Sequence, residues 1–300
     1  MPAISQKNLP EEVASFAPIH SEFGALVSGV NLSQVLDDAT FAAVDAAINQ
    51  YSILLFKNQQ MNDDLQLTFT ARFGQLEEEH VTYYSQGKVT YIGRVGNIGD
   101  DGNKVSSHQN KASTGNEMWH SDSSFREIPA MYSILSAYEV PDEAGETEFA
   151  SGRSAYQRLD QKTRDLIDSK IAIHDYIYSR TKVGEDAVSQ GQRTYMHPVR
   201  QRLVRQNPVS GDRNVFVGSH IKEIEGMPNA QAKPLIEQLI AETTRPQSVY
   251  RHRWQAGDVM IWDNRCILHR GCGYDPDRYR RRMHQTRVRG MAPSIAEKIS

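Results

Sequence analysis

The chain has few cysteines and no long apolar run. Its 300 residues include two cysteines, Cys266 and Cys272, which cannot form a disulfide framework and suit a reducing compartment. No interior segment has the length and apolar character of a membrane span, and the N-terminal residues do not resemble a signal peptide. We therefore expect a cytoplasmic protein that has no membrane partner.

An excess of charge of one sign is also lacking. The 34 basic and 37 acidic residues give a net charge of −3, which argues against general nucleic-acid binding. The stretch 278–289 is locally basic, but it lacks the interleaved aromatic residues of a nucleic-acid surface. A specific site for a small molecule explains its arginines better, and a solvated charged strand is the alternative.

Short apolar runs separated by turn residues indicate a mainly β chain with inserted helices. Strand-like runs occur at residues 52–56, 89–92, 130–140, 146–149, 171–178, 199–204, 214–217, 250–254, 259–262, 267–269 and 280–288. Apolar residues at helical spacing, preceded by capping residues, occur at residues 38–51, 62–73, 151–166 and 229–244. This pattern predicts a sandwich or barrel decorated by helices, and we expect residues 1–300 to form a single domain.

Two polar stretches interrupt this pattern. Residues 77–117 contain several glycines and lead directly to a candidate metal ligand. Such a long loop in a compact domain is often an active-site lid, and a disordered surface excursion is the alternative. A second flexible loop is expected at about residues 179–194.

The stretch Met118–Phe125 contains the His-x-Asp triplet of His120 and Asp122. If this stretch is a β-strand, the two side chains share one face and can bind one metal ion. His269, far along the chain, offers a third ligand, and two histidines with one carboxylate are typical of non-haem Fe(II) oxygenases. His20-x-Glu22 is a competing candidate of the same type. A zinc hydrolase and a non-catalytic binding barrel remain alternatives at this point.

Four stretches together carry a family resemblance, namely 119–125, 145–149, 250–254 and 262–271. In order and spacing they resemble the taurine and 2,4-dichlorophenoxyacetate dioxygenase family (TauD/TfdA), and they look closest to its aryloxyacetate branch. The resemblance implies a double-stranded β-helix (a jelly-roll, cupin-like core). It also implies an enzyme that uses Fe(II), 2-oxoglutarate and O2, forms succinate and CO2, and assembles as a homo-oligomer, a dimer or larger.

The same resemblance assigns roles to individual residues. His120, Asp122 and His269 would bind Fe(II), and Thr147 would bind the distal carboxylate of 2-oxoglutarate. Arg281 would pair with that carboxylate through its planar guanidinium group. An ungapped count from His269 selects Arg280 instead, and we prefer Arg281.

One position departs from the family. Gln285 stands where relatives place an arginine that holds the substrate's anionic group, and two-residue alternation puts it on the same strand face as Arg281 and Arg287. Either the substrate carries no anion there, or Arg287 or Lys104 supplies the charge. The substrate is therefore expected to be aryloxyalkanoate-like or another small carboxylate or amino acid.

Two further pocket candidates come from the resemblance, and the outcome of the reaction stays open. Asn116 and His220 occupy positions that contact substrate in relatives, although each has a structural role as its alternative. The expected reaction is hydroxylation of a C–H bond, and desaturation or ring formation would need only a different substrate pose.

Overall fold

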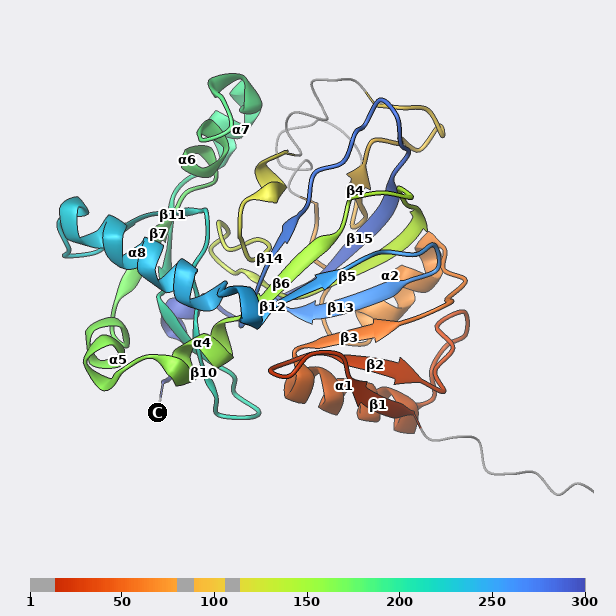
Figure 1. Cartoon of the computed structure of the whole chain (residues 1–300), viewed down its shortest axis with the longest axis horizontal. Helices are drawn as coiled ribbons and strands as arrows, with labels where there is room; N and C mark the ends of the chain where they lie inside the picture. The colour runs from red at the N-terminus through yellow and green to blue at the C-terminus, as the bar shows by residue number, and fades with distance from the viewer. Residues whose placement is uncertain (1–13, 80–88, 106–113, 300) are drawn as a thin grey trace, which may run out of the picture.

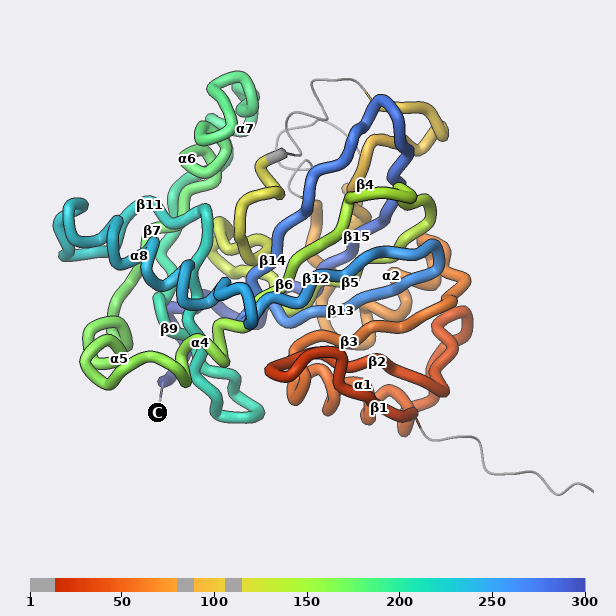
Figure 2. Tube along the Cα trace, viewed as in Figure 1, coloured from red at the N-terminus to blue at the C-terminus, as the bar shows by residue number. Residues whose placement is uncertain are grey.

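The computed structural model describes residues 14–79, 89–105 and 114–299. Figures 1 and 2 show a large sheet at the right of the molecule and smaller sheets at its centre and left. The large sheet has seven strands in the order β1-β2-β3-β13-β5-β15-β4, and its pairs are antiparallel except β2 with β3. These strands are β1 (Ser15–Pro18), β2 (Ala25–Ser28), β3 (Ile53–Phe56), β13 (Val259–Asp263), β5 (Ala130–Glu139), β15 (Arg282–Arg289) and β4 (Gly93–Gly96).

Three smaller sheets complete the β structure of the described residues. Their orders are β12-β6-β14, β11-β7-β8 and β10-β9, and every pair is antiparallel. The strands are β12 (Val249–His252), β6 (Thr147–Ser151), β14 (Ile267–Gly271), β11 (Ile221–Ile224), β7 (Ile171–His174), β8 (Val199–Arg202), β10 (Arg213–Val215) and β9 (Val204–Gln206).

The helices begin at polar capping residues for the most part. Asp37 accepts a hydrogen bond from the backbone N–H of Thr40 at 2.8 Å, and Asn62 caps the next helix in the same way. The helices are α1 (Asp38–Tyr51), α2 (Asp63–Ala71), α4 (Gly152–Arg158), α5 (Gln161–Ile167), α6 (Tyr176–Thr181), α7 (Gln190–Tyr195) and α8 (Asn229–Thr243). The 3₁₀ turns are η2 (Thr114–Glu117), η3 (Glu185–Ala187), η4 (Pro246–Ser248) and η5 (Ser294–Ala296). No helix among the described residues is long and apolar enough to span a membrane.

Strand β13 is buried on both faces, and its alternating side chains join two parts of the core. Val259 and Ile261 pack in the cluster that includes residues of α1 and α2, which cover one face of the large sheet (Figure 1). Met260 and Trp262 point to the other face, where they pack with Phe149 of β6. Strand β13 therefore connects the helix-covered face of the sheet to the face on which the candidate site lies.

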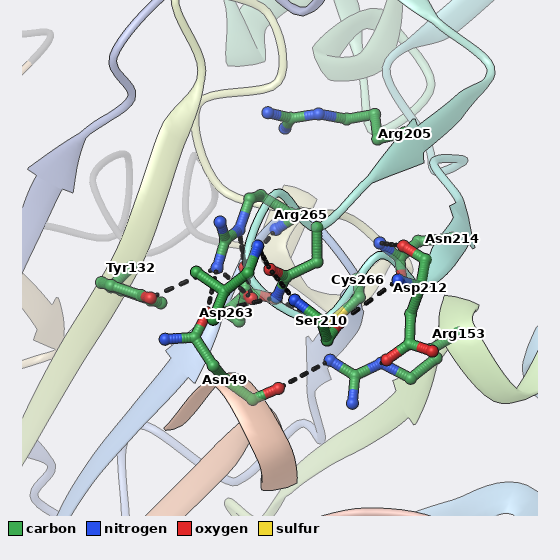
Figure 3. Close-up of polar contacts among 12 residues, drawn as sticks. Asn49, Tyr132, Arg153, Arg205, Ser210, Asp212, Asn214, Asp263, Arg265 and Cys266 are labelled. Carbon is green, nitrogen blue, oxygen red and sulfur yellow. Dashed lines mark hydrogen bonds and ion pairs between the residues drawn. The ribbon is translucent and has the colours of Figure 1, made fainter. Parts of the chain in front are cut away.

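A buried ion pair fixes the turn between β13 and β14 (Figure 3). The guanidinium of Arg265 donates to Asp263 at 2.8 Å, and it also donates to Asn49 and Tyr132 at 3.2 Å each. A buried charge is tolerated when it is paired and hydrogen-bonded in this way. The fixed turn sets the start of β14 and so the position of His269.

Most predicted elements are confirmed, and five are corrected. The strand expected at 199–204 is divided between β8 and β9, which belong to different sheets. The strand expected at 89–92 lies instead at 93–96, as β4. The helix expected at 151–166 is two helices, because Leu159 is extended and Asp160 caps a new start. The strand expected at 171–178 ends at His174, because Asp175 caps α6.

The expected loop at 179–194 is also corrected. This stretch contains the end of α6, η3 and most of α7. Helix α7 begins with a capping box in which Ser189 and Gln192 hydrogen-bond each other's backbone N–H groups. Of the expected lid at 77–117, residues 80–88 and 106–113 lie outside the described residues, and the described part contains β4 and η2.

Candidate active site

The two histidines of the candidate triad are brought together by a β-bridge. His120 and His269 exchange both backbone hydrogen bonds, at 3.0 and 2.8 Å, which places their side chains in direct register. Their ring centroids lie 4.3 Å apart. The chain then turns at once, with Ser123 in the left-handed region (φ 55°). His120 thus lies in an isolated β-bridge and Asp122 lies in the turn that follows it. The two residues are not in the regular strand that we expected.

Asp122 faces both imidazoles with one oxygen. Its Oδ1 lies 3.7 Å from Nε2 of His120 and 3.7 Å from Nε2 of His269. Its other oxygen, Oδ2, accepts hydrogen bonds from Ser133 at 2.7 Å and from Gln285 at 2.8 Å. The carboxylate is therefore held by one oxygen and offers the other to the space between the rings.

The protonation states of the three groups match those of metal ligands. Burial lowers the pKa of His269 to about 3, and burial also lowers the pKa of His120. For Asp122, burial opposes ionisation, but the neighbouring His269, His120 and Arg287 hold its pKa below the ordinary value. Neutral imidazoles beside an ionised carboxylate are what a divalent metal requires.

The donor set fits one metal ion. Nδ1 of His120 lies 2.7 Å from the carbonyl oxygen of Met118, which makes it the N–H donor and leaves Nε2 as an acceptor. The possible ligand atoms of His120, Asp122 and His269 all lie within 4.8 Å of one another. Among the described residues, these three form the group of side chains that could hold a metal ion. Three such ligands leave other coordination positions open, as in the non-haem Fe(II) triad.

The competing triplet does not form a metal site. Nδ1 of His20 accepts the backbone N–H of Glu22 at 3.2 Å, and the carboxylate of Glu22 pairs with Arg158 at 2.9 Å. The structure therefore favours the triplet that contains Asp122.

A cavity beside the triad contains both candidate ligands for 2-oxoglutarate. Thr147 and Arg281 line it together with the three triad residues. The Oγ1 of Thr147 accepts a hydrogen bond from Nε1 of Trp254 at 2.9 Å, so its own O–H is left to donate into the cavity. Arg280, the alternative, is exposed and pairs with Glu139 at 2.7 Å.

Arg281 is a buried cation for which the described part of the chain provides no carboxylate partner. Its Nε has no hydrogen-bond partner, and burial lowers the pKa of the side chain to about 10. A buried unpaired guanidinium is costly unless a ligand neutralises it. This cavity therefore suits a small molecule that carries a carboxylate.

Two residues that position Arg281 were not predicted. The buried Asn97 side chain accepts from the backbone N–H of Arg281 at 2.8 Å, and the N–H of Asn97 donates back to the carbonyl of Arg281 at 3.0 Å. Gly96 allows this approach, because a Cβ there would lie 2.0 Å from the carbonyl oxygen of Arg281. The glycines of this stretch were the available signal, and we had interpreted them as a loop.

The candidates for substrate contact are not all in the cavity. Asn116 and Gln285 line it, but Gln285 is engaged by Asp122 and by Nη1 of Arg287 at 2.9 Å. Arg287 is buried between Glu77 and Glu79. The shared face that we predicted for Arg281, Gln285 and Arg287 is thus confirmed, but Arg287 has no free charge.

The other two candidates lie outside the cavity lining. Lys104 is exposed and donates to the carbonyl oxygens of Pro276 and Asp277 at 2.9 and 2.6 Å. His220 is buried with its ring centroid 6.1 Å from that of His120, and its Nε2 has no hydrogen-bond partner. Burial lowers the pKa of His220 well below the ordinary value.

Comparison with known proteins identifies the family. The family model "Taurine catabolism dioxygenase TauD, TfdA family" matches residues 15–287. The chain belongs to this family. The TauD/TfdA resemblance seen in the sequence is therefore confirmed, and the four stretches that carried it lie within the matched region.

Three known proteins are similar to this chain along most of its length. The alpha-ketoglutarate-dependent 2,4-dichlorophenoxyacetate dioxygenase of Cupriavidus pinatubonensis is 36% identical over 264 residues, which are 86% of this chain and 92% of that protein. The (S)-phenoxypropionate/alpha-ketoglutarate-dioxygenase of Delftia acidovorans is 35% identical over 86% of this chain and 89% of its own length. A crystal structure of AAD-2 in complex with Mn(II) and N-oxalylglycine is 33% identical and has a TM-score of 0.86, and the alignment covers 95% of this chain and 100% of that one.

Proposed function

We propose that the protein hydroxylates a small organic acid at an Fe(II) ion held by His120, Asp122 and His269. Its family makes it a 2-oxoglutarate-dependent dioxygenase, an oxidoreductase. The observation that carries the residue assignment is the shared cavity, in which the triad lies beside the unpaired guanidinium of Arg281. A zinc hydrolase has no use for this second carboxylate anchor.

Each residue has a defined task in this reaction. Arg281 pairs with the distal carboxylate of 2-oxoglutarate, and the hydroxyl of Thr147 donates to the same group. The keto-acid end of the molecule is thereby directed to the triad. Val95, Leu135 and Trp262 form apolar walls of the cavity and exclude water.

The bound iron, with 2-oxoglutarate and O2, supplies the oxidation of a C–H bond and yields succinate and CO2. The protein holds the metal ligands in place and orients one C–H bond of the substrate toward the metal. Ser133 and Gln285 keep Asp122 from rotating by holding its Oδ2. Desaturation or ring formation would leave these tasks unchanged and is distinguished by the mass of the product.

We also propose the finer features that the family resemblance implies. The sheet β12-β6-β14 and the seven-stranded sheet share a core cluster, which supports the double-stranded β-helix of a jelly-roll, cupin-like core. A single catalytic domain over residues 1–300, a lid within 77–117 and a homo-oligomer complete this proposal. The two free cysteines support a cytoplasmic location, and light scattering of the purified protein tests the oligomeric state.

Anaerobic titration of Fe(II) and 2-oxoglutarate into the apo-protein tests this function. We expect a weak visible metal-to-ligand charge-transfer band, which is lost in His120→Ala and in Arg281→Ala. Arg280→Ala is the matched control and should keep the band, because that side chain is exposed and pairs with Glu139. A well-folded, iron-loaded wild type that lacks the band would contradict the proposal.

A further inference from the structure

Arg180, in α6, is a second buried cation that lacks a carboxylate partner. Five arginines are buried among the described residues, namely Arg180, Arg205, Arg265, Arg281 and Arg287. Three of them form ion pairs: Arg205 with Glu297, Arg265 with Asp263, and Arg287 with Glu77 and Glu79. Arg180 and Arg281 do not. In the proposed function Arg281 binds the distal carboxylate of 2-oxoglutarate. The burial of Arg180 without a carboxylate partner therefore needs a separate explanation.

The contacts of Arg180 leave most of its donors unused. Nη2 donates to the side-chain oxygen of Asn116 at 2.9 Å, whereas Nε and Nη1 are buried without a hydrogen-bond partner. The guanidinium lies over the ring of Tyr176, 5.0 Å from its centroid. Gly115 packs against it so closely that a Cβ there would lie 1.6 Å from Nη1.

Arg180 is not itself in the cavity lining, but its contacts place it directly behind a residue that is. Asn116, its acceptor, lines the cavity that contains the triad. Tyr176 stacks on His220, and His220 in turn lies 6.1 Å from His120 between ring centroids. After burial, the charge of Arg180 is a further cause of the lowered pKa values of His120 and His220.

Arg180 approaches the site from another side than Arg281 does. Arg281 directly precedes β15, whereas Arg180 lies in α6, and Figure 1 shows η2 and β14 between these two elements. One anionic molecule bound at Arg281 and a second bound at Arg180 would therefore approach the metal from different directions.

The other cations considered for the substrate are already engaged. Gln285 replaces the arginine of relatives and is hydrogen-bonded to Asp122. Arg287 is neutralised by two glutamates, and Lys104 donates to backbone carbonyls at the surface. Among the buried arginines of the described residues near the triad, Arg180 is thus the one besides Arg281 that has nitrogen donors without a partner.

We propose that Arg180 binds the carboxylate of the substrate and thereby takes over the task of the arginine that Gln285 replaces. This inference rests on the proposed function and adds the direction from which the substrate enters. A guanidinium group holds a carboxylate through paired hydrogen bonds from Nη2 together with Nε or Nη1, so the carboxylate would share Nη2 with Asn116. The substrate is then a small organic acid, with the oxidised carbon lying between Arg180 and the metal.

Calorimetric titration of two matched probes tests the proposal. The enzyme is loaded with Mn(II) and N-oxalylglycine so that no turnover occurs, and it is titrated with 2,4-dichlorophenoxyacetate and with neutral 2,4-dichloroanisole. In the wild type we expect the acid to bind at least about 10-fold more tightly than the neutral probe, the value of one charge-assisted hydrogen bond. Arg180→Met should remove this preference by weakening the acid alone, and Arg180→Lys should restore part of it.

A second variant keeps Arg180 but should displace its guanidinium group. Gly115→Ala places a methyl group where the guanidinium lies and should reduce acid binding without affecting the neutral probe. Unchanged acid binding in Arg180→Met, equal losses for both probes, or a wild type without preference for the acid would each overturn the proposal. The charge-transfer band with Fe(II) and 2-oxoglutarate should persist in Arg180→Met, and its absence from the wild type would instead overturn the proposed function.

Thermal unfolding separates binding from a purely structural role. Removing an unpaired buried charge should leave Tm unchanged or raise it, so Arg180→Met should be at least as stable as the wild type. Arg205→Met is the matched control, since it leaves the carboxylate of Glu297 without its partner and should lower Tm. A fall in Tm for Arg180→Met as large as that for Arg205→Met would show that Arg180 serves the fold and not the substrate.

Discussion

Replacement of Gln285 by methionine should weaken metal binding although Gln285 is not expected to touch the metal. The side chain donates to Oδ2 of Asp122 at 2.8 Å and accepts from Arg287 at 2.9 Å. Methionine has a similar length but cannot donate. Arg287 keeps its two glutamate partners, so the main loss falls on Asp122, which becomes freer to rotate.

The size of this effect follows from the contacts of Asp122. A hydrogen bond to a charged group contributes about 1.5–3 kcal/mol to stability. Ser133 still holds the same oxygen at 2.7 Å, so we expect the lower part of that range. About 1.5–2 kcal/mol corresponds to a roughly 10- to 30-fold higher Kd for the metal, within the span usual for groups that orient a ligand.

Mn(II) binding, followed by electron paramagnetic resonance of the free ion, measures this Kd without turnover. Thr286→Val is the matched control. Thr286 lies on the opposite face of the same strand, where it contacts Thr70 at 2.6 Å, so this variant should lose stability and keep its metal affinity. A folded Gln285→Met protein with wild-type affinity for Mn(II) would refute the role that we assign to Gln285.

Three further predictions concern other parts of the molecule. Arg281→Met should raise the Kd for 2-oxoglutarate at least about 30-fold through loss of a buried charge-assisted pair, whereas Arg280→Met, at the surface, should change it less than about twofold. Trp254→Phe removes the donor to Thr147 and should weaken 2-oxoglutarate about 3- to 10-fold, measured by titration of the charge-transfer band. His174 is neutral in the fold because burial lowers its pKa to about 3. The free energy of unfolding is therefore not reduced by this group above about pH 6.5, and it falls as the pH is lowered from there toward 3. Urea unfolding of wild type and His174→Leu at pH 7 and pH 5 should therefore show about 2 kcal/mol less acid destabilisation in the variant, and equal losses would contradict this account.

Periodicity and capping residues predicted the fold where local sequence determines it. Asp37 and Asn62 begin α1 and α2 as expected, and the apolar run at 259–262 forms the central strand β13. The stretch 179–194 was misinterpreted because its residues are polar and its helices are only about two turns long. Such short helices carry too few apolar repeats for periodicity to register, and the capping box at Ser189 was the signal that could have revealed α7.

The sequence predicted those residues of the candidate site whose chemical type differs from that of their neighbours in the sequence. His120, Asp122 and His269 could be selected as chemical types, and a family resemblance added Thr147 and Arg281. The residues that hold them in place could not be selected in this way. Ser133 is one of two serines in β5, and Asn264, which directly follows the neighbouring strand β13, donates to its hydroxyl at 2.8 Å. Such contacts depend on strand register and leave no pattern in a single sequence.

The family resemblance implies an arginine at the position of Gln285, and on that basis Gln285 has a consequence for which elements serve the co-substrate and which serve the substrate. In the proposed function, β15 and Arg281, which directly precedes it, serve the co-substrate and the metal ligand, because Gln285 is hydrogen-bonded to Asp122. An arginine at 285 could serve a substrate anion from that strand, whereas a glutamine in contact with the ligand cannot. In the proposal made above, recognition of the substrate then comes from another element, α6, in which two buried nitrogens of Arg180 have no hydrogen-bond partner among the described residues. A change of substrate among related chains would on this view require changes in α6 and η2, while β15 and Arg281 stay the same.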